Sequence, residues 1–209
     1  MKEQLQKDFD NIIKNLSLSQ RDTEIKQFYL DNFINKGFPN RRDENWKFSD
    51  LNQIIKKNIG ELSFYNDYTS TSKVDTSVFV DGLEHNKIVF INGRIEKIDF
   101  DYEKKDQIEI IDKSETINKF NNNNSLSDLN NAFTNKSFKI IVKNGYQLVK
   151  PLIIYHITNS DIWSKNINLR LDFELGKDSS LRLIDLYNDT SEKNFLNIFY
   201  NFDLKENAV

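Results

Sequence analysis

The sequence predicts a mainly β protein with a small α-helical region at its N-terminus. Apolar residues recur with helical spacing within the first sixty residues, whereas β-rich runs broken by short turns fill the chain from Phe138 onward. The β-rich runs also repeat about every thirty residues. We therefore expect three regions: a helical region at 1–60, a linker and mixed α/β segment at 61–135, and a repetitive β region at 136–209.

Three helices are expected in the first region. The first carries apolar residues on one face, at Leu5, Phe9, Ile12, Ile13 and Leu16. The second begins after Ser19, a good N-cap residue, and ends at Gly37, which suits a left-handed position after a helix. The third covers about residues 49–57, with Leu51, Ile54 and Ile55 facing inward.

The middle region mixes loop, strand and helix signals. Residues 61–80 are polar and aperiodic, as in a linker. A hairpin is predicted at 87–98, because Asn92–Gly93 suits a turn in which both central residues have positive φ. A strand is expected at 107–111 and short helices at 114–120 and 125–133.

The β region contains an internal repeat. Residues 142–148 align with residues 175–181, and Phe173 aligns with Phe202, so that apolar flanks and turns coincide. A β-solenoid produces such a pattern, and so does an antiparallel sandwich with evenly spaced hairpins. The last repeat stops at Val209 before its returning strand, and we therefore expect the chain to be part of a longer protein.

The composition narrows the function classes. A net charge of −3 gives no support for nucleic acid or a membrane surface as partner, and no apolar run of membrane-spanning length occurs. The absence of Cys excludes disulfides and thiolate-ligated clusters within these residues. No phosphate-binding glycine motif is present. A cytoplasmic location is the simplest expectation.

Several segments resemble a known family. Residues 36–51, KGFPNRRDENWKFSDL, resemble the N-terminal signature of SufD proteins, with Asn40 in place of the usual Thr. Residues 88–94, 129–133 and 142–152 resemble later SufD segments in the same order, with Lys143 in place of a common Pro. The match covers most of the chain between about residues 36 and 204.

The resemblance implies both a fold and a function. The fold would be the start of a right-handed parallel β-helix preceded by helices. The function would be that of a non-catalytic scaffold subunit of the SufBCD complex for iron–sulfur cluster assembly. Its partners would be a SufB-like protein and a SufC-like ATPase of the ABC type. No cofactor is expected in this segment, because the complex as a whole handles the cluster and SufC uses the ATP.

One charged segment is the candidate contact site. Arg41, Arg42, Glu44 and Lys47 surround Trp46 in the segment that resembles SufD. They are interpreted either as a partner-contact surface or as a structural anchor. In the second interpretation Trp46 is buried, while the charged residues form ion pairs and cap the next helix.

Two other classes remain as alternatives. A β-helix carbohydrate-active enzyme would use a pair of acids among Asp172, Glu174, Asp178 and Asp185, although strand alternation explains them as outward-facing residues. A SufB-like family member with a different partner is also possible. His85 and His156 have no His or Cys near them in sequence, and we expect one exposed and one hydrogen-bonded histidine rather than metal ligands.

Overall fold

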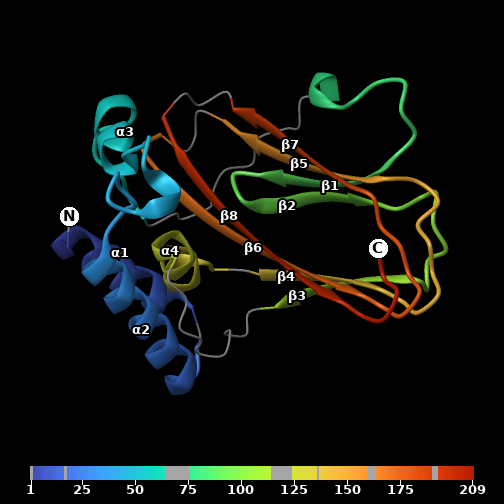
Figure 1. Cartoon of the computed structure of the whole chain (residues 1–209), viewed down its shortest axis with the longest axis horizontal. Helices are drawn as coiled ribbons and strands as arrows, with labels where there is room; N and C mark the ends of the chain where they lie inside the picture. The colour runs from blue at the N-terminus through green and yellow to red at the C-terminus, as the bar shows by residue number, and fades with distance from the viewer. Residues whose placement is uncertain are drawn as a thin grey trace.

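A computed structural model describes residues 2–16, 18–64, 76–113, 124–135, 137–159, 163–189 and 193–209. The α-helices gather at one end of the molecule, and two β-sheets extend from them toward the other end, where the C-terminus lies (Figure 1). No helix in these ranges is long and apolar enough to cross a membrane. The predicted helix at 114–120 and most of the predicted linker lie outside the described residues.

The helical elements follow the sequence pattern closely. Their bounds are Lys2–Asn15 for α1, Gln20–Lys36 for α2, Glu44–Trp46 for the 3₁₀ helix η1, Leu51–Asn58 for α3, Thr76–Val78 for the 3₁₀ helix η2 and Ser125–Phe133 for α4. The Ser19 hydroxyl accepts a hydrogen bond from the Asp22 N–H at 3.1 Å, and Gly37 ends α2 with a φ of 73°. The predicted caps of α2 are therefore confirmed.

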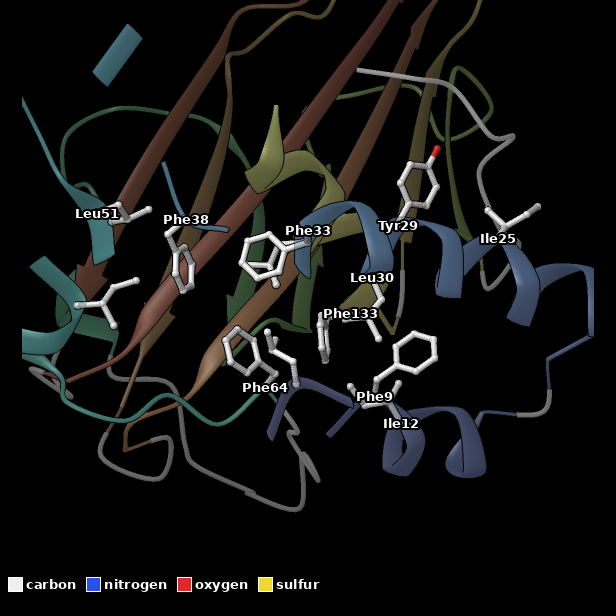
Figure 2. Close-up of a cluster of buried hydrophobic side chains, with 14 residues drawn as sticks. Phe9, Ile12, Ile25, Tyr29, Leu30, Phe33, Phe38, Leu51, Phe64 and Phe133 are labelled. Carbon is white, nitrogen blue, oxygen red and sulfur yellow. The ribbon is translucent and has the colours of Figure 1, made fainter. Parts of the chain in front are cut away.

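An aromatic-rich core holds the helices together. Phe9 of α1, Phe33 of α2, Phe64 and Phe133 of α4 are all buried in it (Figure 2). Phe9 and Phe133 meet edge to face, with ring centroids 6.1 Å apart. Because Phe133 is far from α1 and α2 in sequence, this core joins α4 to the N-terminal helices.

In the described ranges, eight strands form two sheets of four. Their bounds are Asn86–Ile91 (β1), Arg94–Asp99 (β2), Ile108–Lys113 (β3), Ser137–Val142 (β4), Leu152–Thr158 (β5), Asn166–Leu175 (β6), Leu183–Asp189 (β7) and Phe195–Leu204 (β8). The strand orders are β2-β1-β5-β7 and β3-β4-β6-β8. From β4 onward, successive strands alternate between the sheets. Strands β7 and β8 are the edge strands at the same side of the two sheets.

The predicted repeat gives the observed register. Val142 pairs with Leu175 in β4–β6, and Phe173 pairs with Phe202 in β6–β8, both in parallel. An isolated bridge joins Gln147 to Ser180 in the same alignment. The hairpin is also confirmed: β1 and β2 are antiparallel, and Asn92 and Gly93 have φ values of 51° and 81°.

The expectation of a right-handed parallel β-helix is wrong. The described residues form two mixed sheets and four α-helices, an α/β arrangement, because β1–β2 and β3–β4 pair antiparallel. An antiparallel sandwich is equally inconsistent, since β1, β5 and β7 pair in parallel, as do β4, β6 and β8. The thirty-residue recurrence correctly predicted which residues pair in the parallel strands of the repeats. It could not predict the antiparallel strands β2 and β3, because they precede the repeats in the chain.

The main β core lies between the two sheets. It combines Phe90 of β1 and Ile154 of β5 from one sheet with Ile140 of β4 and Phe173 of β6 from the other. Side chains alternate along each strand, so every second residue faces this interior. The interior-facing positions of β5, β7 and β8 include the polar residues described below.

Candidate functional site

The predicted contact segment lies between α2 and α3. The Leu51 N–H donates to the Pro39 carbonyl at 3.0 Å and closes residues 39–51 into a loop that contains η1. Within the loop, the Asp43 carboxylate accepts a hydrogen bond from the Asn40 N–H at 2.8 Å. Trp46 is partly buried and packs on the helical core. The indole therefore contacts the helical core, whereas the expected anchor joined the helical region to a β-helix, which the structure does not contain.

Four charged side chains of this loop are exposed and form no salt bridge with the described residues. Arg41, Arg42, Glu44 and Lys47 face solvent, and none of these four makes a salt bridge with any part of the chain that the structure describes. The next helix, α3, is capped by Asp50, whose carboxylate accepts from the Gln53 N–H at 2.9 Å. The structural interpretation of these charges as ion pairs and caps is therefore wrong.

Sequence reasoning missed an exposed aromatic residue beside these charges. The Phe48 side chain has 95% of its surface exposed, more than any other large apolar side chain among the described residues. It lies two positions after Trp46 at the end of a 3₁₀ turn, in which residues two apart point in different directions. Because Trp46 was expected to face the core, the two-residue spacing could have predicted that Phe48 faces solvent. We refer to Arg41, Arg42, Lys47 and Phe48 as the Arg–Phe surface.

A second group of functional side chains lies between the sheets. His156 of β5, Asp185 and Tyr187 of β7, and Tyr200 of β8 meet there, and we call them the His–Asp–Tyr cluster. In the β5–β7 register, Ile154 pairs with Asp185 and His156 pairs with Tyr187. Because Ile154 faces the core, His156 and its partners on β7 do so too.

The four polar groups are in direct contact. His156 Nε2 lies 2.9 Å from Asp185 Oδ1 and 3.0 Å from the Tyr200 hydroxyl. The Tyr187 hydroxyl donates to Asp185 Oδ2. The imidazole is stacked between two rings, with centroid distances of 5.4 Å to Phe90 and 5.1 Å to Tyr187. These stacks fix the plane of the imidazole and leave its Nε2 edge facing the oxygen atoms.

The electrostatics of the cluster favour a carboxylate flanked by neutral phenols. Burial on its own raises the pKa of Asp185, but the neighbouring His156 and Tyr187 outweigh burial and bring that pKa below its usual value. Burial and the Asp185 carboxylate both raise the pKa of Tyr200 and of Tyr187 well above the ordinary tyrosine range. At neutral pH Asp185 is therefore a carboxylate, and both tyrosines keep their phenolic protons.

Three of the four acids considered for an enzymatic site lie outside both the Arg–Phe surface and the His–Asp–Tyr cluster. Asp172 pairs with Arg170 at 3.1 Å, Glu174 pairs with Lys139, and Asp178 accepts from the Asn207 amide at 2.8 Å. Only Asp185 faces inward, and the alternation of Leu181, Leu183 and Asp185 could have predicted this. The four acids proposed for an enzymatic site are therefore not brought together.

The expectation of one hydrogen-bonded histidine is confirmed, whereas the expectation of one exposed histidine is wrong. Both are buried, His85 with 5% and His156 with 3% of its surface exposed, so neither is the exposed histidine that we expected. His85 Nε2 lies 2.8 Å from the Tyr155 hydroxyl, and its Nδ1 lies 2.6 Å from the Leu83 carbonyl oxygen. These contacts give His85 a structural role between β5 and the loop before β1.

Within the described ranges, no three side chains of the types His, Cys, Asp and Glu gather in a way that could hold a metal ion. Comparison of the chain with models of protein families and with curated proteins found no match.

Proposed function

We propose that this chain is a non-catalytic, SufD-like scaffold subunit of a cytoplasmic SufBCD-type complex for iron–sulfur cluster assembly. The resemblance of residues 36–51 to the SufD signature supports this proposal. In it, a SufB-like subunit and a SufC-like ATPase are the partners, and ATP hydrolysis belongs to SufC. The chain contributes binding surfaces and rigidity rather than cluster ligands, since it contains no Cys.

The Arg–Phe surface is the observation that carries the proposal. Exposed aromatic and arginine side chains are the residue types that contribute most to the binding energy of protein interfaces. Here an almost fully exposed Phe48 lies in the same loop as Arg41, Arg42 and Lys47, which have no ion-pair partner among the described residues. These cations favour an acidic partner surface with an apolar pocket for the Phe48 ring.

Co-purification tests the proposal. The chain would be co-expressed with the SufB-like and SufC-like proteins of the same genome, and complex formation would be measured by pull-down and by titration. We expect Phe48→Ala, and separately the double variant Arg41→Glu/Arg42→Glu, to weaken the complex by about tenfold or more. Both variants should keep the wild-type melting temperature, because the substituted side chains are exposed.

The matched control reverses two charges elsewhere on the surface. Lys104→Glu/Lys105→Glu changes net charge as much as the arginine variant does, at exposed residues between β2 and β3. This control should bind like the wild type. Failure of the wild-type chain to bind either protein would overturn the scaffold assignment. If the wild type and all variants bind equally well, the Arg–Phe surface is not the surface that contacts the partner.

A further inference from the structure

The His–Asp–Tyr cluster has the composition and spacing of a metal site that uses tyrosine. It offers an imidazole nitrogen, a carboxylate and two phenol oxygens from three different strands. Asp185 Oδ1 is buried and receives no well-aligned hydrogen bond from the described residues, although His156 Nε2 is 2.9 Å away. A carboxylate oxygen of this kind, close to a nitrogen and two phenol oxygens that can also bind a metal, is suited to binding a cation.

The distances fit a coordination sphere. Adjacent ligands at right angles around an ion are separated by about 3.0 Å when each metal–ligand bond is about 2.1 Å long. The distances from His156 Nε2 to Asp185 Oδ1 and to the Tyr200 oxygen are 2.9 and 3.0 Å. A bound ion could therefore contact these three atoms in place of the polar contacts that they now make with one another.

The donor chemistry selects the class of ion. Carboxylate and phenolate oxygens are hard ligands, and the cluster has no thiolate that would favour a soft metal. With both phenols ionised, Asp185, Tyr187 and Tyr200 carry three negative charges, which balance a trivalent cation. We propose that His156, Asp185, Tyr187 and Tyr200 form a binding site for ferric iron.

Access to the cluster comes from one side. Tyr187 has 59% of its surface exposed and lies on the edge strand β7, whereas His156 is buried beneath it. An ion can thus reach Tyr187 and Asp185 first and His156 last. Binding releases one proton from each phenol, and any proton on His156 Nε2 must also leave that nitrogen before its lone pair can bind the ion. The affinity should therefore increase steeply as the pH rises.

The experiment uses the 209-residue chain alone and ferric citrate as the probe. Equilibrium dialysis with iron analysis would measure the stoichiometry, and visible absorption would detect the charge-transfer band of phenolate bound to ferric iron. We expect one ion per chain and a visible band. We expect Tyr187→Phe, Tyr200→Phe and Asp185→Asn each to weaken binding by about tenfold or more. Each phenylalanine variant keeps its aromatic ring, and circular dichroism would verify its fold.

Tyr102→Phe is the matched control, because Tyr102 is an exposed tyrosine outside the cluster. It should bind iron like the wild type. Iron that binds without a visible band, or equally well to the double variant Tyr187→Phe/Tyr200→Phe, would be adventitious and would overturn the proposal. A preference for Zn²⁺ over ferric iron would overturn it as well. Since no partner protein is present, this result is independent of the test of the scaffold function.

Discussion

The Lys26 ammonium donates a hydrogen bond of 2.7 Å to the backbone carbonyl of Thr134, the residue that follows α4. It also reaches the carbonyls of Asn131 and Ala132, at 3.3 and 3.5 Å. A buried cation from α2 thus satisfies the C-terminal carbonyls of α4, which have no partner within that helix. Together with the aromatic core, this contact fixes α4 against the N-terminal helices.

Lys26 should make the stability depend on pH in the alkaline range. Burial lowers the pKa of Lys26 to about 8, against a usual value of 10.5. Between these values the unfolded chain binds more protons than the folded one, so stability increases with pH. Relative to Lys26→Met, the free energy of unfolding of the wild type should rise by about 2 kcal/mol from pH 8 to 10.

Urea titrations at several pH values would measure this change. Lys7→Met, which removes an exposed lysine of α1, should give a constant difference from the wild type across the same range. A difference between wild type and Lys26→Met that does not change with pH would show that folding does not lower the pKa of Lys26.

Glu103 should be a strong determinant of stability. Its carboxylate accepts four hydrogen bonds, from the Asn86 amide, the Tyr146 hydroxyl and the N–H groups of Val149 and Lys150. Glu103→Gln would place an NH₂ group against two of these donors. We expect a loss of about 2 kcal/mol in the free energy of unfolding at pH 7, measured by chemical denaturation.

The pH dependence gives a second check on Glu103. Burial alone raises the pKa of Glu103, but the four hydrogen bonds more than compensate and bring it below its usual 4.5. The stabilisation is therefore present above pH 4.5 and is lost as the pH falls through the folded-state pKa. The difference between wild type and Glu103→Gln should shrink in acid. Glu96→Gln, an exposed change on β2, should be neutral throughout.

Gly176 should not tolerate a side chain. A Cβ atom at this position would lie 2.6 Å from the Asn144 backbone nitrogen and 2.8 Å from the Lys143 carbonyl carbon. The Gly176 N–H also donates to the Val142 carbonyl at 2.8 Å, so the two turns cannot separate freely. Gly176→Ala should lower the free energy of unfolding by about 1–3 kcal/mol.

Lys177→Ala is the neighbouring control for Gly176. It removes only an exposed ion pair with Glu206 and should cost less than about 1 kcal/mol. Thermal melts of the two variants would provide the comparison. Equal melting temperatures would contradict the close approach of the turns at Gly176.

Asn130 should require its amide. This fully buried side chain of α4 donates to the carbonyls of Leu169 and Asn197, at 3.0 and 2.8 Å, and so joins the helix to β6 and β8. Asn130→Asp would place a carboxylate against two carbonyl oxygens. We expect a loss of about 3 kcal/mol or more at pH 7, which becomes smaller in acid once the carboxyl can donate.

Asn45→Asp is the matched control for this variant, because Asn45 is exposed in η1. Its stability should stay close to that of the wild type at both pH values. Denaturation at pH 7 and pH 4 would test both variants, and an Asn130→Asp protein as stable as Asn45→Asp would contradict the role assigned to the amide.

The local elements could be predicted from the sequence because they depend on short-range periodicity. The register of the parallel strands could be predicted from the thirty-residue repeat. The stripe that contains Leu5 and Phe9, the caps at Ser19 and Gly37, and the hairpin at Asn92–Gly93 each follow from neighbouring residues. The repeat gave the pairing of Val142 with Leu175, because residues that stack in parallel strands have matching patterns. The exposed positions of Arg41 and Arg42 are consistent with the predicted surface.

The sheet architecture and the second site were decided by the tertiary structure. The alignment of repeats could not show that β2 and β3 add antiparallel strands, because these strands lie outside the repeat. His156 and Tyr200 are 44 positions apart, and they meet only because β5 and β8 belong to facing sheets. Alternation within one strand tells which side a residue faces. Which residue it meets there depends on how the sheets pack, and that depends on contacts between distant segments of the chain.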